Sequence, residues 1–172
     1  MYNLPASRFA DNKIWRKALS QISKIKPIVD MGCGVGMLAE LCKETGHKYE
    51  VGFDFSSIAI EKARKRVPHT RFEQIDFNKA DISFHTDGYV FIFFEILEHL
   101  EEDLNLLSQI KPRNKIFISV PNFDSESHVR HFDSMHDVFR RYGGIMRINY
   151  DETFQVSDEH KIFLISGERN SR

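Results

Sequence analysis

The sequence predicts a doubly wound α/β fold built around a mostly parallel sheet, and three observations lead to this prediction. Short apolar runs alternate with longer segments of helical period, which is typical of stacked βα units. Two runs, at 90–94 and 116–120, are apolar on both faces, as strands are when helices cover both sides of a sheet. Another run, at 27–31, leads through alternate glycines into a helical segment, at the edge where such sheets bind ligands.

The central elements follow from the apolar runs and from the residues that end helices. Each predicted helix stops before a residue that breaks it, namely Gly46, Pro68 or Pro112. We expect strands at 27–31, 49–54, 70–75, 89–94 and 115–120, with helices at 35–45, 57–67 and 100–110.

Further elements are expected on either side of this central part. Apolar residues at helical spacing predict an amphipathic helix or lid within residues 1–26. A helix is expected at 134–142, before two glycines. The runs at 147–156 and 160–166 flank a polar turn, which predicts an antiparallel hairpin at the edge of the sheet.

Charge balance and cysteine content narrow the class of protein. The 172 residues include 24 Lys and Arg against 25 Asp and Glu, so no overall positive field attracts a nucleic-acid backbone. No apolar run approaches the roughly 18 residues of a membrane-spanning helix. The first residues lack the pattern of a secretory signal, and two cysteines are too few for disulfide bonds to stabilise a secreted chain of this size. We therefore expect one cytoplasmic domain, residues 1–172, with no membrane partner; the sequence predicts no oligomeric state.

Three alternate glycines, Gly32, Gly34 and Gly36, follow the first predicted strand and let the backbone turn tightly against a ligand. A phosphate-binding P-loop is excluded, because no lysine and hydroxyl residue close the turn. A dinucleotide fingerprint needs glycine where Met37 stands, and the Asp30 carboxylate would repel a pyrophosphate. The loop therefore favours a ligand that carries positive charge and no phosphate.

Residues 30–36, with the sequence D-M-G-C-G-V-G, resemble the first motif of the class I S-adenosylmethionine-dependent methyltransferases. Residues 52–56, followed by 59–63, resemble the end of that family's second strand and its helix, and the resemblance covers nearly the whole chain. It implies a seven-stranded, Rossmann-like methyltransferase fold with the last strand antiparallel. It also implies S-adenosyl-L-methionine as methyl donor and S-adenosyl-L-homocysteine as product, and the cationic donor suits the Asp30 carboxylate.

The resemblance assigns donor-binding roles residue by residue. Asp54 would accept hydrogen bonds from the ribose hydroxyls, and Asp76 would accept one from the exocyclic amine of adenine. Phe55 and Phe77 would enclose the adenine ring, or else belong to the core. The expected donor-binding residues are Asp30, Gly32, Cys33, Gly34, Gly36, Asp54, Phe55, Asp76, Phe77 and Glu95.

An acidic motif with the sequence E-I-L-E-H, residues 95–99, follows the fourth predicted strand. It resembles the E-x-L-E-H signature of a subgroup that includes ubiquinone-biosynthesis O-methyltransferases and many small-molecule methyltransferases. Residues 119–122 and 127–132 resemble further elements of this subgroup. Because histidine titrates near neutrality, we expect His99 and His128 to be catalytic and to take a proton from the oxygen or nitrogen of a small-molecule acceptor.

Two other functions remain open from the sequence. Carboxylates and imidazoles can bind a divalent metal, and this region contains four such residues: Glu95, Glu98, His99 and His128. A similar E-x-x-E-H core serves the small-RNA 3′-terminal 2′-O-methyltransferases, so an RNA acceptor with a metal is one alternative. A catalytically idle nucleotide-binding or scaffolding module on the same fold is the other. The basic residues are spread among acidic neighbours, which disfavours RNA. We expect no bound metal, and methyl transfer that a chelator does not inhibit.

Overall fold

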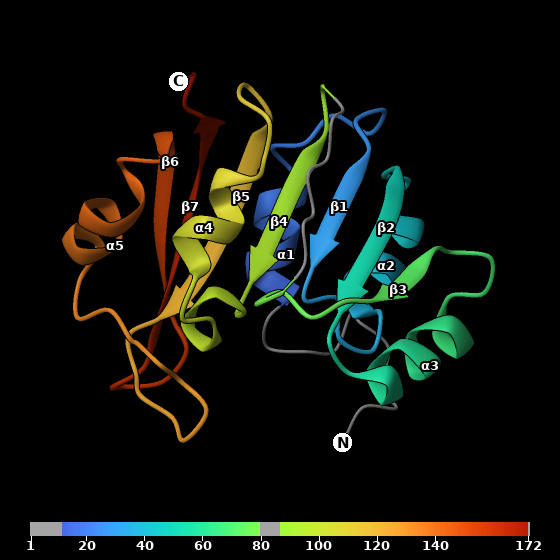
Figure 1. Ribbon diagram of the computed structural model, residues 1–172, viewed down its shortest axis with the longest axis horizontal. Coiled ribbons are helices and arrows are strands. Elements are labelled where there is room, and N and C mark those ends of the chain that lie inside the picture. Colours follow the sequence, from blue (N-terminus) through green and yellow to red (C-terminus); the bar gives the residue numbers. More distant parts are fainter. Residues whose placement is uncertain (1–11, 80–86, 172) are drawn as a thin grey trace. The chain divides into compact units, whose positions relative to one another are not determined.

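The computed structural model describes residues 12–79 and 87–171 (Figure 1). By their internal contacts these residues fall into two compact units. Among the described residues, the first unit comprises 12–76 and 89–91, and the second comprises 77–79, 87–88 and 92–171. The single domain that we expect over residues 1–172 therefore stays a prediction, and the two units are described one at a time.

Seven strands form one sheet in the order β3-β2-β1-β4-β5-β7-β6, which confirms the predicted fold class (Figure 1). In the first unit, β2 pairs in parallel with β1 and with β3; in the second, β7 pairs antiparallel with β5 and with β6. The strands are β1 (Ile28–Met31), β2 (Tyr49–Asp54), β3 (Phe72–Gln74), β4 (Val90–Phe94), β5 (Lys115–Pro121), β6 (Met146–Gln155) and β7 (Lys161–Arg169).

The helices alternate with the strands as the sequence predicts. Of those in the first unit, α2 and α3 pack against β2, and α3 also packs against β3. The helices are α1 (Asn12–Leu19), α2 (Met37–Thr45), α3 (Ser57–Arg66), α4 (Asp103–Ser108) and α5 (Met135–Tyr142), with a 3₁₀ turn, η2 (Leu97–His99), before α4. Helix α1 accounts for part of the helix or lid expected within 1–26, and residues 1–11 lie outside the described residues.

The helix expected at 100–110 is wrong in its first turn. The turn η2 ends at His99, before this segment, and α4 begins only at Asp103 and ends at Ser108. The guanidinium of Arg130 donates to the carbonyl oxygens of Leu97 and Leu100, at 2.6 and 2.5 Å. The Leu104 N–H, which a helix starting at Leu100 would pair with the Leu100 carbonyl, donates instead to the Asp103 Oδ1 at 2.8 Å. Because Arg130 satisfies the Leu100 carbonyl, the helix can start later.

A buried ion-pair cluster lies within the second unit, centred on the fully buried Asp103. The Arg141 guanidinium donates two hydrogen bonds to its carboxylate, at 2.9 and 2.5 Å, and the Tyr142 hydroxyl donates a third at 3.0 Å. Arg130 lies 3.4 Å from the same carboxylate. One acid therefore joins the start of α4, the end of α5 and the loop after β5.

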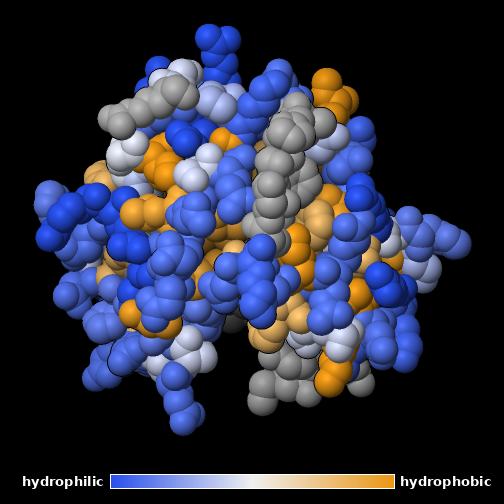
Figure 2. Space-filling model, in the orientation of Figure 1, coloured by the Kyte–Doolittle hydropathy of each residue, from blue (hydrophilic) through white to orange (hydrophobic). Residues whose placement is uncertain are grey.

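Hydrophilic side chains predominate on the face of the molecule that Figure 2 shows, with smaller apolar groups between them. Along residues 12–79 and 87–171, no helix has the length and apolar character needed to cross a membrane. Within the described ranges, the large apolar side chains that are exposed are Ile25, Phe55, Ile58, Val129, Phe139 and Val156. Two of these lie at the start of α3: Phe55 precedes the helix and Ile58 is in its first turn. This part of the first unit adjoins Asp54, one of the predicted donor-binding residues.

Candidate functional site

The glycine loop between β1 and α2 takes a backbone conformation that favours glycine. Gly32, Gly34 and Gly36 have φ values of 90°, 51° and 81°, in the left-handed region. A Cβ atom at Gly36 would lie 3.0 Å from the Cβ of Ala63, so this glycine lets α2 approach α3. A Cβ at Gly34 would meet nothing within 4 Å among residues 12–79 and 87–171, so no described residue fills the space beside the loop at this point. A ligand can therefore approach the backbone of the loop at Gly34.

Asp54, at the end of β2, holds the glycine loop in place. Its Oδ2 accepts a hydrogen bond from the Gly34 N–H at 2.9 Å, and its Oδ1 accepts one from the Ser56 N–H at 2.9 Å. The sequence predicted only a role toward the ribose and missed this internal one. Each carboxylate oxygen keeps a second lone pair, so Asp54 can hold the loop and still accept from a ribose hydroxyl.

Asp30, in β1, is a buried acid next to this loop. It is 3% exposed, and the Tyr49 hydroxyl donates a hydrogen bond to its Oδ2 at 2.8 Å. Burial raises the pKa of Asp30 from 3.8 to about 7; the Tyr49 hydrogen bond opposes this change, and the Asp54 charge adds to it. An ionised Asp30 is therefore costly unless positive charge compensates it, which suits a cationic ligand.

The pH dependence of stability provides a test of this environment. Because the pKa of Asp30 is raised in the folded state, folding takes up a proton between about pH 4 and pH 7, and the free energy of unfolding falls as pH rises through that range. Asp30→Asn removes this contribution. We expect the variant's stability relative to wild type to increase from pH 5 to pH 8 by up to a few kcal/mol, at about 1.4 kcal/mol per pKa unit. Urea unfolding at both pH values measures the difference.

The exposed Asp158, in the turn between β6 and β7, offers a matched control. Asp158→Asn is expected to follow the wild-type pH dependence. Parallel pH profiles for wild type and Asp30→Asn would contradict a raised pKa at Asp30.

The other predicted donor residues differ in exposure. Phe55 is 67% exposed and free to stack on a flat ring, whereas Phe77 is 6% exposed and buried like a core residue. Asp76 is exposed and follows Ile75, whose N–H donates to the Asp54 carbonyl oxygen at 2.9 Å. Asp76 therefore lies just beyond the carboxyl end of β3, next to the end of β2.

Cys33 has its side chain in the core rather than in the loop opening. It packs in a buried cluster formed by residues of α2, α3 and β3. Burial raises the pKa of its thiol well above the ordinary value, and the Asp30 charge adds to this effect, so the thiol is not a nucleophile at neutral pH. Any contact of this residue with a donor would come from its backbone.

The second unit contains the acidic motif, which begins at the carboxyl end of β4. Glu95 has a φ of 52°, which is uncommon for a residue other than glycine. Its N–H donates to the Ser119 carbonyl oxygen at 3.2 Å, and its Oε1 accepts from the Ser119 hydroxyl at 2.7 Å. These two bonds to β5 hold the residue in the left-handed conformation.

Glu98 is the most unusual residue of the motif because its carboxyl is 1% exposed. Burial raises the pKa of Glu98 to about 9, and the neighbouring Glu95 charge adds to this effect. Its Oε2 has no hydrogen-bond partner among residues 12–79 and 87–171. The sequence placed this residue in a motif but gave no sign of its burial.

The structure brings together His99 and His128, the two residues that the sequence analysis names as catalytic; their catalytic role stays a prediction. Their ring centroids are 4.8 Å apart, with the planes at 76°. The Nδ1 atom of His99 lies 3.0 Å from the Ser127 carbonyl oxygen, and that of His128 lies 3.1 Å from the Phe123 carbonyl oxygen. A carbonyl can only accept, so both Nδ1 atoms carry a proton. The Nε2 atoms are then the ones that can take a proton or bind a ligand.

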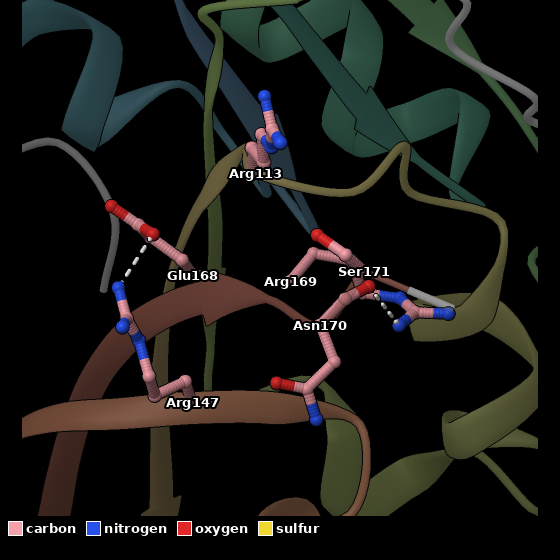
Figure 3. A pocket seen from close by; sticks show the side chains of 6 residues that line it. All are labelled: Arg113, Arg147, Glu168, Arg169, Asn170 and Ser171. Carbon is pink, nitrogen blue, oxygen red and sulfur yellow. Dashed lines mark hydrogen bonds and ion pairs between the residues drawn. The ribbon is translucent and has the colours of Figure 1, made fainter.

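A surface cavity of about 440 Å³ also lies in the second unit (Figure 3). It is found where β5 and β6 begin and β7 ends, whereas the acidic motif follows the carboxyl end of β4. Arg147 pairs with Glu168 at 3.0 Å, and Arg169 donates to the carbonyl oxygens of Leu107 and Ile145. These two arginines of the lining are thus engaged within the protein, and we assign no reaction to this cavity.

The strand order, together with the glycine loop beside the acid that ends β2, defines a class I S-adenosylmethionine-dependent methyltransferase. Residues 7–152 match the family model described as a methyltransferase domain, and the chain belongs to this family. The family inferred from the sequence is thus confirmed, while the subgroup stays a prediction. This class uses S-adenosylmethionine as methyl donor and releases S-adenosylhomocysteine. No curated protein matches the chain.

Solved structures share the fold at low sequence identity. An S-adenosylmethionine-dependent methyltransferase from Mesorhizobium loti is 19% identical, with a TM-score of 0.69 over 95% of this chain and 100% of that chain. The PH0226 protein from Pyrococcus horikoshii is 19% identical, with a TM-score of 0.75 over 98% and 93%. A magnesium protoporphyrin IX methyltransferase from Synechocystis, solved with bound S-adenosylhomocysteine, is 14% identical, with a TM-score of 0.70 over 96% and 84%.

Proposed function

We propose that this chain transfers the methyl group of S-adenosylmethionine to an oxygen or nitrogen atom of a small-molecule acceptor. The observation that carries the proposal is the glycine loop, open at Gly34, tied to Asp54 and adjacent to the buried Asp30. Methyl transfer is an in-line displacement, so the enzyme chiefly aligns the acceptor, the methyl group and the sulfur. The donor's positive charge compensates the carboxylates of the first unit, which a pyrophosphate cannot do.

His99 and His128 are the residues that we assign to the acceptor. Their Nε2 atoms are oriented by bonds at the opposite ring nitrogens, and a histidine so held can assist removal of a proton from a hydroxyl or amine. A small acceptor is favoured over RNA because the net charge is −1 and the basic residues are spread along the chain.

Donor selectivity tests the first half of the proposal. We expect S-adenosylmethionine and S-adenosylhomocysteine to bind, and NAD and ATP to bind far more weakly, because the loop has no phosphate-binding lysine and Asp30 and Asp54 repel phosphate. Titration calorimetry with each ligand alone measures this difference. Tight binding of NAD without binding of S-adenosylhomocysteine would contradict it.

The acceptor class is tested with a donor that carries a radiolabelled methyl group. Labelling of hydroxyl- or amine-bearing metabolites would support the proposal, and labelling of an RNA 3′ end with steep salt dependence would overturn the small-molecule assignment. Donor binding without transfer to any acceptor would favour a catalytically idle module.

A further inference from the structure

We propose that the surface cavity at the start of β5 binds a small molecule that carries a phosphate group and hydroxyl groups, such as a sugar phosphate. Its volume of about 440 Å³ is within the range of roughly 300–1,000 Å³ that small-molecule sites occupy. The lining consists of Arg113, Arg147, Glu168, Arg169, Asn170 and Ser171, all in the second unit. None of them belongs to the donor site or to the acidic motif, so this site does not rest on the proposed methyl transfer.

The charge of the lining favours an anion, because three arginines accompany a single acid. Two of these arginines are engaged within the protein: Arg147 pairs with Glu168, as Figure 3 shows, and Arg169 donates to backbone carbonyl oxygens. The Arg113 guanidinium, in contrast, has no hydrogen-bond or ion-pair partner among residues 12–79 and 87–171. A guanidinium in this state can donate two parallel hydrogen bonds to a phosphate group.

The backbone at Arg113 gives a second reason to assign a role to this side chain. Its φ is 69°, in the left-handed region. The Asn114 N–H donates to the Lys111 carbonyl oxygen at 3.4 Å, and Pro112 followed by a positive φ makes this a type II turn. Glycine is the favoured residue at the third position of such a turn, and an arginine there is strained. A ligand bound by the side chain accounts for an arginine at this position.

The turn that carries Arg113 is fixed against the end of β7. The Arg113 N–H donates to the Arg169 carbonyl oxygen at 3.0 Å, and the Arg169 N–H donates to the Asn114 carbonyl oxygen at 3.0 Å. On the other side of β7, Arg147 lies opposite Glu168 in the pairing of β6 with β7. Backbone bonds therefore hold the charged residues of three segments around one cavity, and a ligand meets a site that is already assembled.

The acid in the lining indicates what the rest of the ligand carries. Glu168 Oε2 pairs with Arg147, and its Oε1 can accept a hydrogen bond from a ligand hydroxyl. In the described part of the chain, Arg113 is the one arginine of the lining without a partner, which suits a single phosphate group rather than the row of phosphates of a nucleic acid. Phosphate at Arg113 and hydroxyl groups at Glu168 together describe a phosphorylated polyol.

Calorimetry of the full chain at pH 7, in a buffer without phosphate, tests the site with ribose 5-phosphate, inorganic phosphate and ribose. We expect one ribose 5-phosphate per chain, bound more tightly than about 1 mM, with weaker binding of inorganic phosphate and no measurable binding of ribose. Glu168→Gln should reduce the preference for ribose 5-phosphate over inorganic phosphate, because it removes the acceptor for the hydroxyl groups and a charge that repels phosphate.

Arg113→Gly separates binding by the side chain from its effect on the fold. The affinity for ribose 5-phosphate should fall at least about tenfold, since a charge-assisted hydrogen-bonded partner is lost. The urea midpoint should stay the same or rise, because glycine adopts this backbone conformation without strain. Arg140→Gln is the matched control: it removes an exposed arginine of the same unit, on α5, and should bind as wild type does.

Wild type that binds ribose 5-phosphate no more tightly than about 1 mM would overturn the proposal, as would an Arg113→Gly variant that binds like wild type. Equal losses in Arg113→Gly and Arg140→Gln would also overturn it, because the attraction would then be one of overall charge. Equal affinities for inorganic phosphate and ribose 5-phosphate would contradict a role for the hydroxyl groups. Displacement of the ligand by saturating S-adenosylhomocysteine would mean that it occupies the donor site instead.

Discussion

Asp103→Ala is expected to lower the free energy of unfolding by about 3 kcal/mol, because it leaves the buried Tyr142 hydroxyl and two partly exposed arginines without their acceptor. Asp103 is fully buried and accepts hydrogen bonds from the Arg141 guanidinium and the Tyr142 hydroxyl, with Arg130 3.4 Å away. Without the carboxylate, these groups keep their desolvation cost and lose their partner. Urea unfolding followed by circular dichroism measures the change.

Asp87 provides the matched comparison for this variant. Its side chain is 72% exposed and pairs with Lys111 at 3.0 Å, so Asp87→Ala removes an exposed ion pair of the same unit. We expect this control to cost less than about 1 kcal/mol, because exposed pairs contribute little. Equal losses in the two variants would mean that the Asp103 cluster contributes no more than a surface pair.

Asp54→Ala is expected to weaken S-adenosylhomocysteine binding by about 1.5–3 kcal/mol, or roughly tenfold to 150-fold, through the loss of hydrogen bonds to a charged acceptor. The variant also removes the carboxylate that accepts from the Gly34 and Ser56 N–H groups, so the loop loses its attachment to β2. Asp54→Asn keeps one acceptor oxygen and should cost less. Titration calorimetry of folded samples measures both variants.

The control for this prediction is Glu73→Ala in β3. Glu73 is an acid of the same unit that pairs with Arg71 at the surface, and its removal should leave donor affinity unchanged. If Asp54→Ala binds the donor like Glu73→Ala, the ribose partner is another residue and Asp54 only supports the loop.

Much of the fold could be predicted because its signals are local. Each signal is contained within a few residues. Examples are a strand that is apolar on both faces, a glycine or proline after a helix, and a polar turn between two apolar runs. The strands at 49–54 and 115–120 and the helix at 57–67 were therefore placed to within one residue at each end. The helix expected at 100–110 is present but shorter, Asp103–Ser108, because the Leu100 carbonyl accepts from Arg130, about thirty residues away, which no local pattern reveals.

The site was predictable in its residue types and less so in its environment. The alternate glycines and Asp54 belong to a motif that can be recognised in the sequence. The burial of Asp30 and Glu98, in contrast, depends on packing that only the folded chain shows. The tautomers of His99 and His128 depend on carbonyl groups of residues 127 and 123, in a loop whose path the sequence does not determine.

The position of β7 has a consequence for the order in which the chain can fold during synthesis. β7 is hydrogen-bonded to both β5 and β6, so these two strands lack their common neighbour until residues 161–169 have left the ribosome. The parallel pairs of the first unit, in contrast, need only residues up to Gln74. A nascent chain therefore passes through an interval in which β1, β2 and β3 can pair while the apolar edge of β5 is uncovered. Open strand edges of this kind invite wrong pairing, and the second unit is the part that a chaperone would have to protect.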